Sequence, residues 1–255
     1  MNPVERGSTI VDALRLGLEP ERVERFTTSV TLQPETLIIR SSKRDEDAPL
    51  VLCLHPPRFN EFQFAQKARG LTTLQAHIAF PRGLYPHLVD LGGARTVGYS
   101  WLHYTGNNPA FHESLAVASD YLDRVMDQLL NELAVDRRSI YLLGAEGASL
   151  CAALQAVRRS TYFAGVVAIG GDVFPDLVLE EAGESHRIPM LWIYNRRGRI
   201  ARSGDARSRA DELNQAGFAV DLDFLHGDDA PWHEEEALII SWLSQKAGIP
   251  AGESA

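Results

Sequence analysis

Apolar residues along the chain gather in short continuous runs, and longer segments with a different periodicity separate these runs. Apolar runs without polar alternation are typical of strands that are buried on both faces of a parallel sheet. Strand candidates of this kind lie at 36–40, 49–54, 77–80, 139–143, 165–169, 190–194 and 220–225. We therefore expect a sheet whose strands are spread over most of the chain.

Helical patterns lie between these strand candidates. In segment 114–133 apolar residues recur every four positions, and similar patterns cover 206–216 and 234–246. Strands that alternate with helices favour a parallel sheet with helices on both faces. The pattern predicts an α/β domain over residues 35–247, built on a doubly wound and mostly parallel sheet.

The two ends of the chain have a different character. Residues 1–34 read as two short amphipathic helices, with Pro20 where the second could begin, and we expect a helical extension packed on the domain. Residues 248–255 are small and polar, which predicts a flexible tail.

Composition narrows the classes of function. The chain has 255 residues with 34 acidic and 25 basic side chains, a formal net charge of −9, which disfavours a broad nucleic-acid interface. No apolar stretch approaches the roughly 20 residues of a membrane span, and the first residues lack a secretory pattern. Cys53 and Cys151 lie in apolar surroundings and predict buried thiols in a reducing, cytoplasmic setting. No motif indicates a metal or a cofactor, so the expected partner is an unknown small molecule or protein.

A tight turn is predicted where strand 139–143 meets the next helix. Residues 144, 145, 147 and 148 are glycine or alanine, and Glu146 stands between them. This order of small residues resembles the nucleophile elbow G-x-S-x-G, in which the central side chain is held in a strained conformation above the sheet. Glutamate replaces the serine here, and Ala148 replaces the last glycine.

Further segments resemble the carboxylesterase/phospholipase family of the α/β-hydrolase fold, which includes acyl-protein thioesterases. The similarity covers about 49–243 and rests on the order of several short segments. They are 52–55, which resembles the strand and histidine of the oxyanion loop; the Pro-Arg-Gly turn in 79–83; Trp101; 163–171; 221–225; and 242–243.

The resemblance implies hydrolysis of an ester or thioester by a Ser-His-Asp triad. The nucleophile position holds Glu146, which has no hydroxyl, and the acid position holds Gly198. His233 is the better candidate for the histidine and His226 the other, although His233 also reads as a surface residue beside three glutamates. Two further residues are possible substitutes for the triad acid: Asp172 and Asp205.

The segment that resembles the oxyanion loop also departs from the family pattern, and this departure also argues against catalysis. Its H-G-x-G motif reads His55-Pro56-Pro57-Arg58 here, and Pro57 has no N–H at the position that should donate to the oxyanion. Loss of one such donor removes about 2.7–4 kcal/mol of transition-state stabilisation. A carboxylate at Glu146 would also repel an oxyanion. The sequence therefore argues against serine-esterase activity.

The favoured interpretation is a binding or regulatory pseudo-enzyme that keeps the cleft of the fold. Its predicted binding residues are Pro57, Arg58, Trp101, His103, Glu146 and Gly147. An arginine is expected to pair with Glu146 in place of the triad. The candidates follow strand ends: Arg58, Arg82, Arg196, Arg197 and Arg199.

Two alternatives remain open. Glu146 could act as a carboxylate nucleophile, as aspartate does in haloalkane dehalogenases and epoxide hydrolases. The chain could also be an ordinary carboxylic ester hydrolase with another nucleophile, for which Ser100, Ser149 and Cys151 are the candidates.

Overall fold

A computed structural model describes residues 34–41, 47–91, 94–103, 109–183, 187–195, 203–225 and 232–249. Contacts divide the chain into two units, Met1–Gln33 and Pro34–Ala255, and all described residues belong to the second. The two helices expected in the first unit lie outside the described residues. No helix in the described part is both long and apolar enough to cross a membrane.

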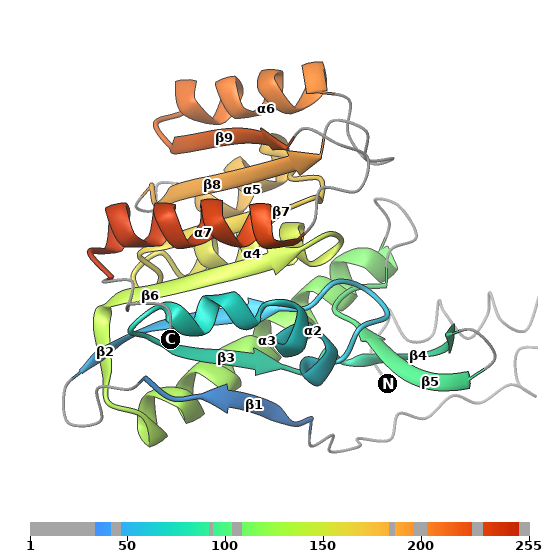
Figure 1. Cartoon of the computed structure of the whole chain (residues 1–255). Coiled ribbons are helices and arrows are strands. Elements are labelled where there is room, and N and C mark those ends of the chain that lie inside the picture. Colours follow the sequence, from blue (N-terminus) through green and yellow to red (C-terminus); the bar gives the residue numbers. More distant parts are fainter. Residues whose placement is uncertain are drawn as a thin grey trace, which may run out of the picture. The chain divides into compact units, whose positions relative to one another are not determined.

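A sheet of seven strands forms the centre of the second unit (Figure 1). Its order is β1-β3-β2-β6-β7-β8-β9, and only the edge strand β1 runs antiparallel to its neighbour. The strands are β1 (Thr36–Ile39), β2 (Ala48–Leu54), β3 (His77–Pro81), β6 (Val135–Ala145), β7 (Gly165–Ile169), β8 (Pro189–Asn195) and β9 (Ala219–Leu225). This arrangement confirms the predicted doubly wound, mostly parallel sheet.

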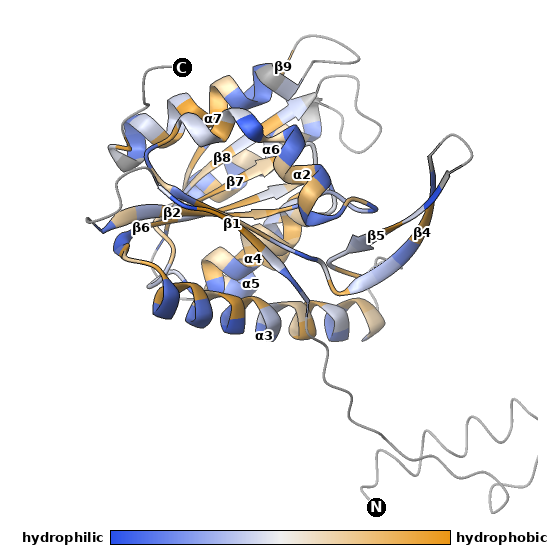
Figure 2. Ribbon diagram, turned by 60° about the horizontal axis from the view of Figure 1, so that its bottom comes forward, coloured by the Kyte–Doolittle hydropathy of each residue, from blue (hydrophilic) through white to orange (hydrophobic). Residues whose placement is uncertain are grey.

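Helices cover both faces of the sheet. One apolar core joins the sheet to α3, α4, α5 and α6, and a second joins it to α2 and α7. The helices are α2 (Glu61–Lys67), the 3-10 helix η2 (Arg69–Thr73), α3 (Pro109–Glu132), α4 (Ala148–Arg158), α5 (Pro175–Ala182), α6 (Ser203–Gln215) and α7 (Trp232–Ala247). Figure 2 shows apolar residues on the sheet and a polar outer stripe along α3.

Strand β2 shows why its sequence is continuously apolar. Leu50, Leu52 and Leu54 point into the first core, and Val51 and Cys53 point into the second. Because successive side chains of a strand point to opposite faces, a central strand with a core on both sides requires apolar residues throughout. The same reasoning applies to β6 and β7.

A two-stranded antiparallel hairpin, β4 (Tyr85–Leu91) with β5 (Ala94–Ser100), projects beside the sheet in Figures 1 and 2. Neither strand of this hairpin is among the strand candidates of the sequence. A bridge between Phe59 and Tyr99 ties the hairpin to the loop that follows β2. The chain leaving β5 then returns toward the carboxyl ends of the parallel strands.

The C-terminal boundary also differs from the expectation. Ile249 was assigned to the flexible tail, yet its side chain is buried in the second core. The reason is packing, because this residue, the second after the end of α7, still reaches apolar neighbours on that face of the sheet.

Candidate functional site

The predicted elbow is present between β6 and α4. Strand β6 ends at Ala145 and α4 begins at Ala148, so Glu146 stands at the tip of the turn with φ of 52°. The Glu146 N–H donates to the carbonyl of Ile169 at 2.6 Å, and the Glu146 carbonyl accepts from the Ser149 N–H at 2.9 Å. These two hydrogen bonds fix the backbone in a left-handed conformation that residues other than glycine rarely adopt.

Close packing around the turn explains its small residues. A Cβ on Gly144 would lie 2.7 Å from the Ala152 Cβ, and one on Gly171 would lie 2.6 Å from the Ser149 Oγ. Both positions therefore exclude any side chain, which is why the strand can turn so sharply into the helix.

A cleft of about 490 Å³ opens beside the elbow. Its walls come from the oxyanion loop after β2, the hairpin and the segment after it, the elbow with α4, and the segment after β7. The lining residues are Pro57, His87, Ser100, Trp101, Leu102, His103, Glu146, Gly147, Leu150, Gly171, Asp172 and Phe174. A cleft at the carboxyl ends of the strands is the usual ligand site of an open α/β sheet.

Comparison with protein-family models gives no match, and no curated protein matches the sequence. Solved structures do match. The esterase PE8 is 14% identical with a TM-score of 0.66, and the similarity covers 82% of this chain and 99% of that one. The Bacillus cereus carboxylesterase is 15% identical with a TM-score of 0.60, over 84% of this chain and 94% of that one. Arabidopsis thaliana SOBER1 is 16% identical with a TM-score of 0.62, over 78% of this chain and 99% of that one.

The chain has the α/β-hydrolase fold. Identities of this size establish the fold and leave the chemistry to the residues of the cleft. In an α/β-hydrolase the tip of the elbow carries the nucleophile, and here the tip carries Glu146.

Pro57 alters the loop after β2, which resembles the oxyanion loop of the α/β-hydrolase fold. A Cβ on Gly147 would lie 2.9 Å from the Pro57 Cγ, so the proline ring packs directly against the residue whose N–H should face an oxyanion. Pro57 itself has no N–H to donate.

His55 holds the loop that carries Pro57. Its Nε2 accepts from the Gly83 N–H at 2.9 Å, its Nδ1 lies 2.9 Å from the Pro56 carbonyl, and its own carbonyl accepts from the Trp101 indole at 3.1 Å. Burial lowers the pKa of His55 to about 4. The ring is therefore neutral at pH 7, and its contacts give it a structural role.

Arg82, one of the five candidate partners of Glu146, is bound to other carboxylates. Arg82 forms an ion pair and several hydrogen bonds with the buried Glu61, and it also pairs with Glu35. Glu61 reaches Arg82 because α2 packs against β3, and Arg82 directly follows β3. Arg58, with φ of 70°, has an exposed side chain and does not line the cleft.

No cation of the described residues forms an ion pair or hydrogen bond with the Glu146 carboxylate. The three other predicted partners, Arg196, Arg197 and Arg199, lie outside the described residues. Gly198 and His226, the predicted acid position and the second histidine candidate, also lie outside the described residues. His233 belongs to the first turn of α7, and its side chain lies outside the described part.

Asp172 lines the cleft and is engaged by a partner. One of its carboxylate oxygens accepts from Arg209 of α6 at 2.8 Å, and the Arg209 guanidinium also lies over the Phe174 ring. This ion pair ties α6 to the wall of the cleft. Asp205, the other substitute acid, is exposed on α6 and is not a lining residue.

The glutamates at the start of α7 are not all solvated, contrary to the surface interpretation of this segment. Glu236 is buried and accepts from the Gly70 N–H at 2.8 Å. Burial raises the pKa of Glu235 to about 7, with the charge of Glu146 adding to the rise and Lys67 opposing it. Glu235 is thus a second carboxylate close enough to Glu146 to be influenced by its charge.

The alternative nucleophiles differ in accessibility. Ser149 is fully buried, with its Oγ 3.0 Å from the Gly144 carbonyl and within hydrogen-bond distance of both backbone polar groups of Ile169. Cys151 is also buried, and burial raises its thiol pKa to about 12. Ser100 alone of the three lines the cleft.

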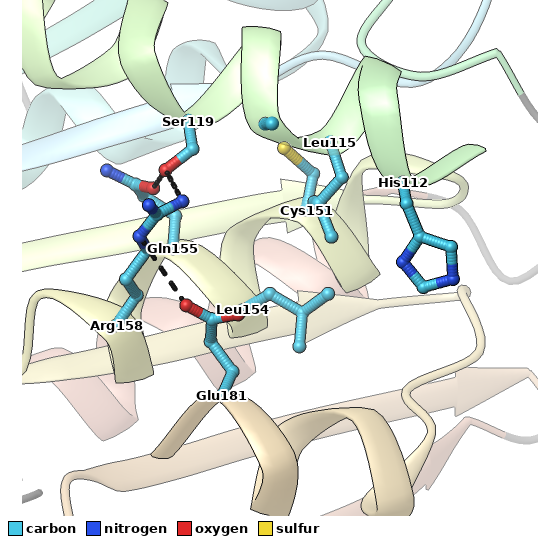
Figure 3. A pocket seen from close by; sticks show the side chains of 9 residues that line it. His112, Leu115, Ser119, Cys151, Leu154, Gln155, Arg158 and Glu181 are labelled. Atoms are coloured by element: carbon cyan, nitrogen blue, oxygen red, sulfur yellow. Dashed lines mark hydrogen bonds and ion pairs between the residues drawn. The ribbon is translucent and has the colours of Figure 1, made fainter. Parts of the chain in front are cut away.

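Cys151 borders a second cavity of about 160 Å³, between α3, α4 and α5 (Figure 3). Its polar side chains bind one another: Ser119 donates to Gln155, Arg158 donates to Ser119, and Arg158 pairs with Glu181. This network is a structural contact between helices. No group of three potential metal ligands occurs among the described residues.

Some residues that line the cleft were not predicted from the sequence. His87 comes from β4, and the Gly-Gly pair between two strand-like runs was the signal that could have revealed it. Leu102, Leu150 and Phe174 carry no signal of their own, since only the tertiary fold brings them to the cleft.

Proposed function

We propose that this α/β-hydrolase is a binding protein for a small molecule and lacks serine-esterase activity. One observation carries the proposal: the strained tip of the elbow, where a serine would have to attack, presents the carboxylate of Glu146.

The oxyanion loop supports the same conclusion independently. Pro57 has no N–H, and its ring packs against Gly147. Loss of one donor removes about 2.7–4 kcal/mol of transition-state stabilisation, and a carboxylate beside the hole adds repulsion. The cleft itself persists, with the size and the mostly apolar walls of a ligand site.

A fluorophosphonate probe together with a short-chain p-nitrophenyl ester tests the proposal. We expect no covalent labelling and no turnover above the uncatalysed rate. Labelling that is lost in Ser100→Ala would overturn the proposal and identify an ordinary ester hydrolase with an unrecognised nucleophile.

The second candidate function is a hydrolase with Glu146 as nucleophile, which the position of this carboxylate at the tip favours. Such an enzyme forms an ester on Glu146 that water then cleaves, so a single turnover in ¹⁸O-labelled water would leave label in the Glu146 side chain. We expect an unlabelled peptide by mass spectrometry. Label at Glu146 would refute the proposed binding function and support a hydrolase with Glu146 as nucleophile.

A further inference from the structure

We propose that the cleft selects organic ammonium ions, with Glu146 as their counter-ion and the apolar walls holding their hydrocarbon part. This inference rests on the proposed binding function, because it assumes that the cleft is occupied by a ligand and not by an ester in turnover.

The walls define the body of the ligand. Trp101, Leu102, Leu150 and Phe174 give the cleft a mostly apolar lining, and its volume of about 490 Å³ falls in the range of small-molecule sites. Burial of apolar ligand surface against such walls provides affinity without directional contacts. A compact aliphatic or aromatic group is therefore suitable.

The charges define the head group. Asp172 is already paired with Arg209, and Glu235 is influenced by Lys67, whose ammonium also lies over the Trp232 ring. Of the strand-end arginines that the structure describes, Arg82 is bound to Glu61, and Arg58 is exposed and does not line the cleft. Within the described residues Glu146 is thus the carboxylate at the cleft without a cationic partner.

The unpaired carboxylate of Glu146 favours some classes of ligand over others. An anionic ligand would be repelled by Glu146, and a neutral ligand would leave the carboxylate without a partner where it displaces water. A primary ammonium supplies three donors and a positive charge, and charge-assisted hydrogen bonds are the stronger kind. The aromatic residues of the lining are also compatible with a cation.

Three probes of similar shape separate these classes: 2-phenylethylammonium, 2-phenylethanol and 3-phenylpropanoate. Isothermal titration of the full chain at pH 7 and low salt should show the ammonium binding about tenfold or more tighter than the alcohol. The carboxylate should bind most weakly. Equal affinities, a preference for the carboxylate, or no binding of any probe would overturn the inference.

Charge variants assign the effect to one side chain. Glu146→Gln should reduce the preference for the ammonium over the alcohol to about twofold or less. The matched control Glu212→Gln removes the same charge from the exposed face of α6 and should keep the full preference. A preference that survives in Glu146→Gln, with circular dichroism showing both variants folded, would contradict the role of Glu146.

The two proposals fail in distinguishable ways. Ester turnover or fluorophosphonate labelling removes the binding function, whatever the amine affinity is. Absence of ammonium selectivity in a protein that stays silent toward both reagents removes only the ligand class.

Discussion

Gly171 controls the position of the elbow, and replacing it with alanine is the sharpest test of the geometry. The new Cβ would lie 2.6 Å from the Ser149 Oγ and 2.7 Å from the Glu146 carbonyl carbon, and closer still to the Glu146 carbonyl oxygen. The atoms in conflict belong mainly to backbone at the tip of the turn. No rotation of a flexible side chain can relieve the overlap, so the elbow itself has to move.

The expected destabilisation follows from two contributions. Forcing a methyl group into packed structure destabilises by about 1–3 kcal/mol. Displacing Ser149 also weakens its hydrogen bonds to Gly144 and Ile169, each of which stabilises by about 1 kcal/mol. We expect Gly171→Ala to lower the free energy of unfolding by about 3 kcal/mol, which for a chain of this size lowers Tm by roughly 6–12 °C.

Urea unfolding followed by circular dichroism measures the change, with Gly170→Ala as control. Gly170 has φ of +65°, but its nearest neighbour to an added Cβ is the Glu146 Cγ at 4.0 Å, so alanine there adds backbone strain of about 1 kcal/mol without a clash. Gly171→Ala should therefore be the more damaging of two adjacent substitutions. If it is no worse than Gly170→Ala, the described packing around Glu146 is wrong.

Two carboxylates give further predictions. Burial alone would raise the pKa of Glu61, but the Arg82 guanidinium holds it below the usual value. Glu61→Gln should therefore destabilise by about 3 kcal/mol at pH 7. Urea titrations should show this difference shrinking as the pH falls below 4.5 and through the lowered pKa of Glu61. Burial raises the pKa of Glu235 to about 7, above its value of 4.5 when unfolded, so its stabilising contribution is complete below pH 4.5 and is lost as pH rises through 7. The free energy of unfolding of Glu235→Gln should thus equal that of the wild type at pH 4.5 and be roughly 1–2 kcal/mol higher at pH 8. The same dependence on pH in both proteins would contradict this.

The fold was predictable because its signal is local. A central strand between two cores must be apolar at every position, so β2, β6 and β7 are visible as runs without alternation. The elbow was visible for a similar reason, since its small residues report a close approach of strand and helix. The hairpin β4–β5 was missed because its runs are mixed in polarity, and Leu88 on it is 79% exposed.

The charges of the site were less predictable because each pair joins distant parts of the chain. The position of Arg82 after a strand was correct, but its partner Glu61 is set by the packing of α2, which the sequence pattern did not reveal. The partial burial of Glu235 likewise depends on how α7 packs against the rest of the fold. Strand-end position identifies which residues reach the rim of a parallel sheet, and only the tertiary structure decides how they pair.

The backbone at Glu146 supplies a last argument about function. A residue other than glycine at φ of 52° is strained by about 1 kcal/mol, and glycine would remove that strain. Glu146→Gly should therefore raise the free energy of unfolding by about 1 kcal/mol while abolishing selectivity for an ammonium probe. Such an exchange of stability for binding is expected of a ligand contact and not of a residue that holds the fold together. A destabilised Glu146→Gly variant would instead show that the carboxylate supports the structure, through a partner beyond the described residues.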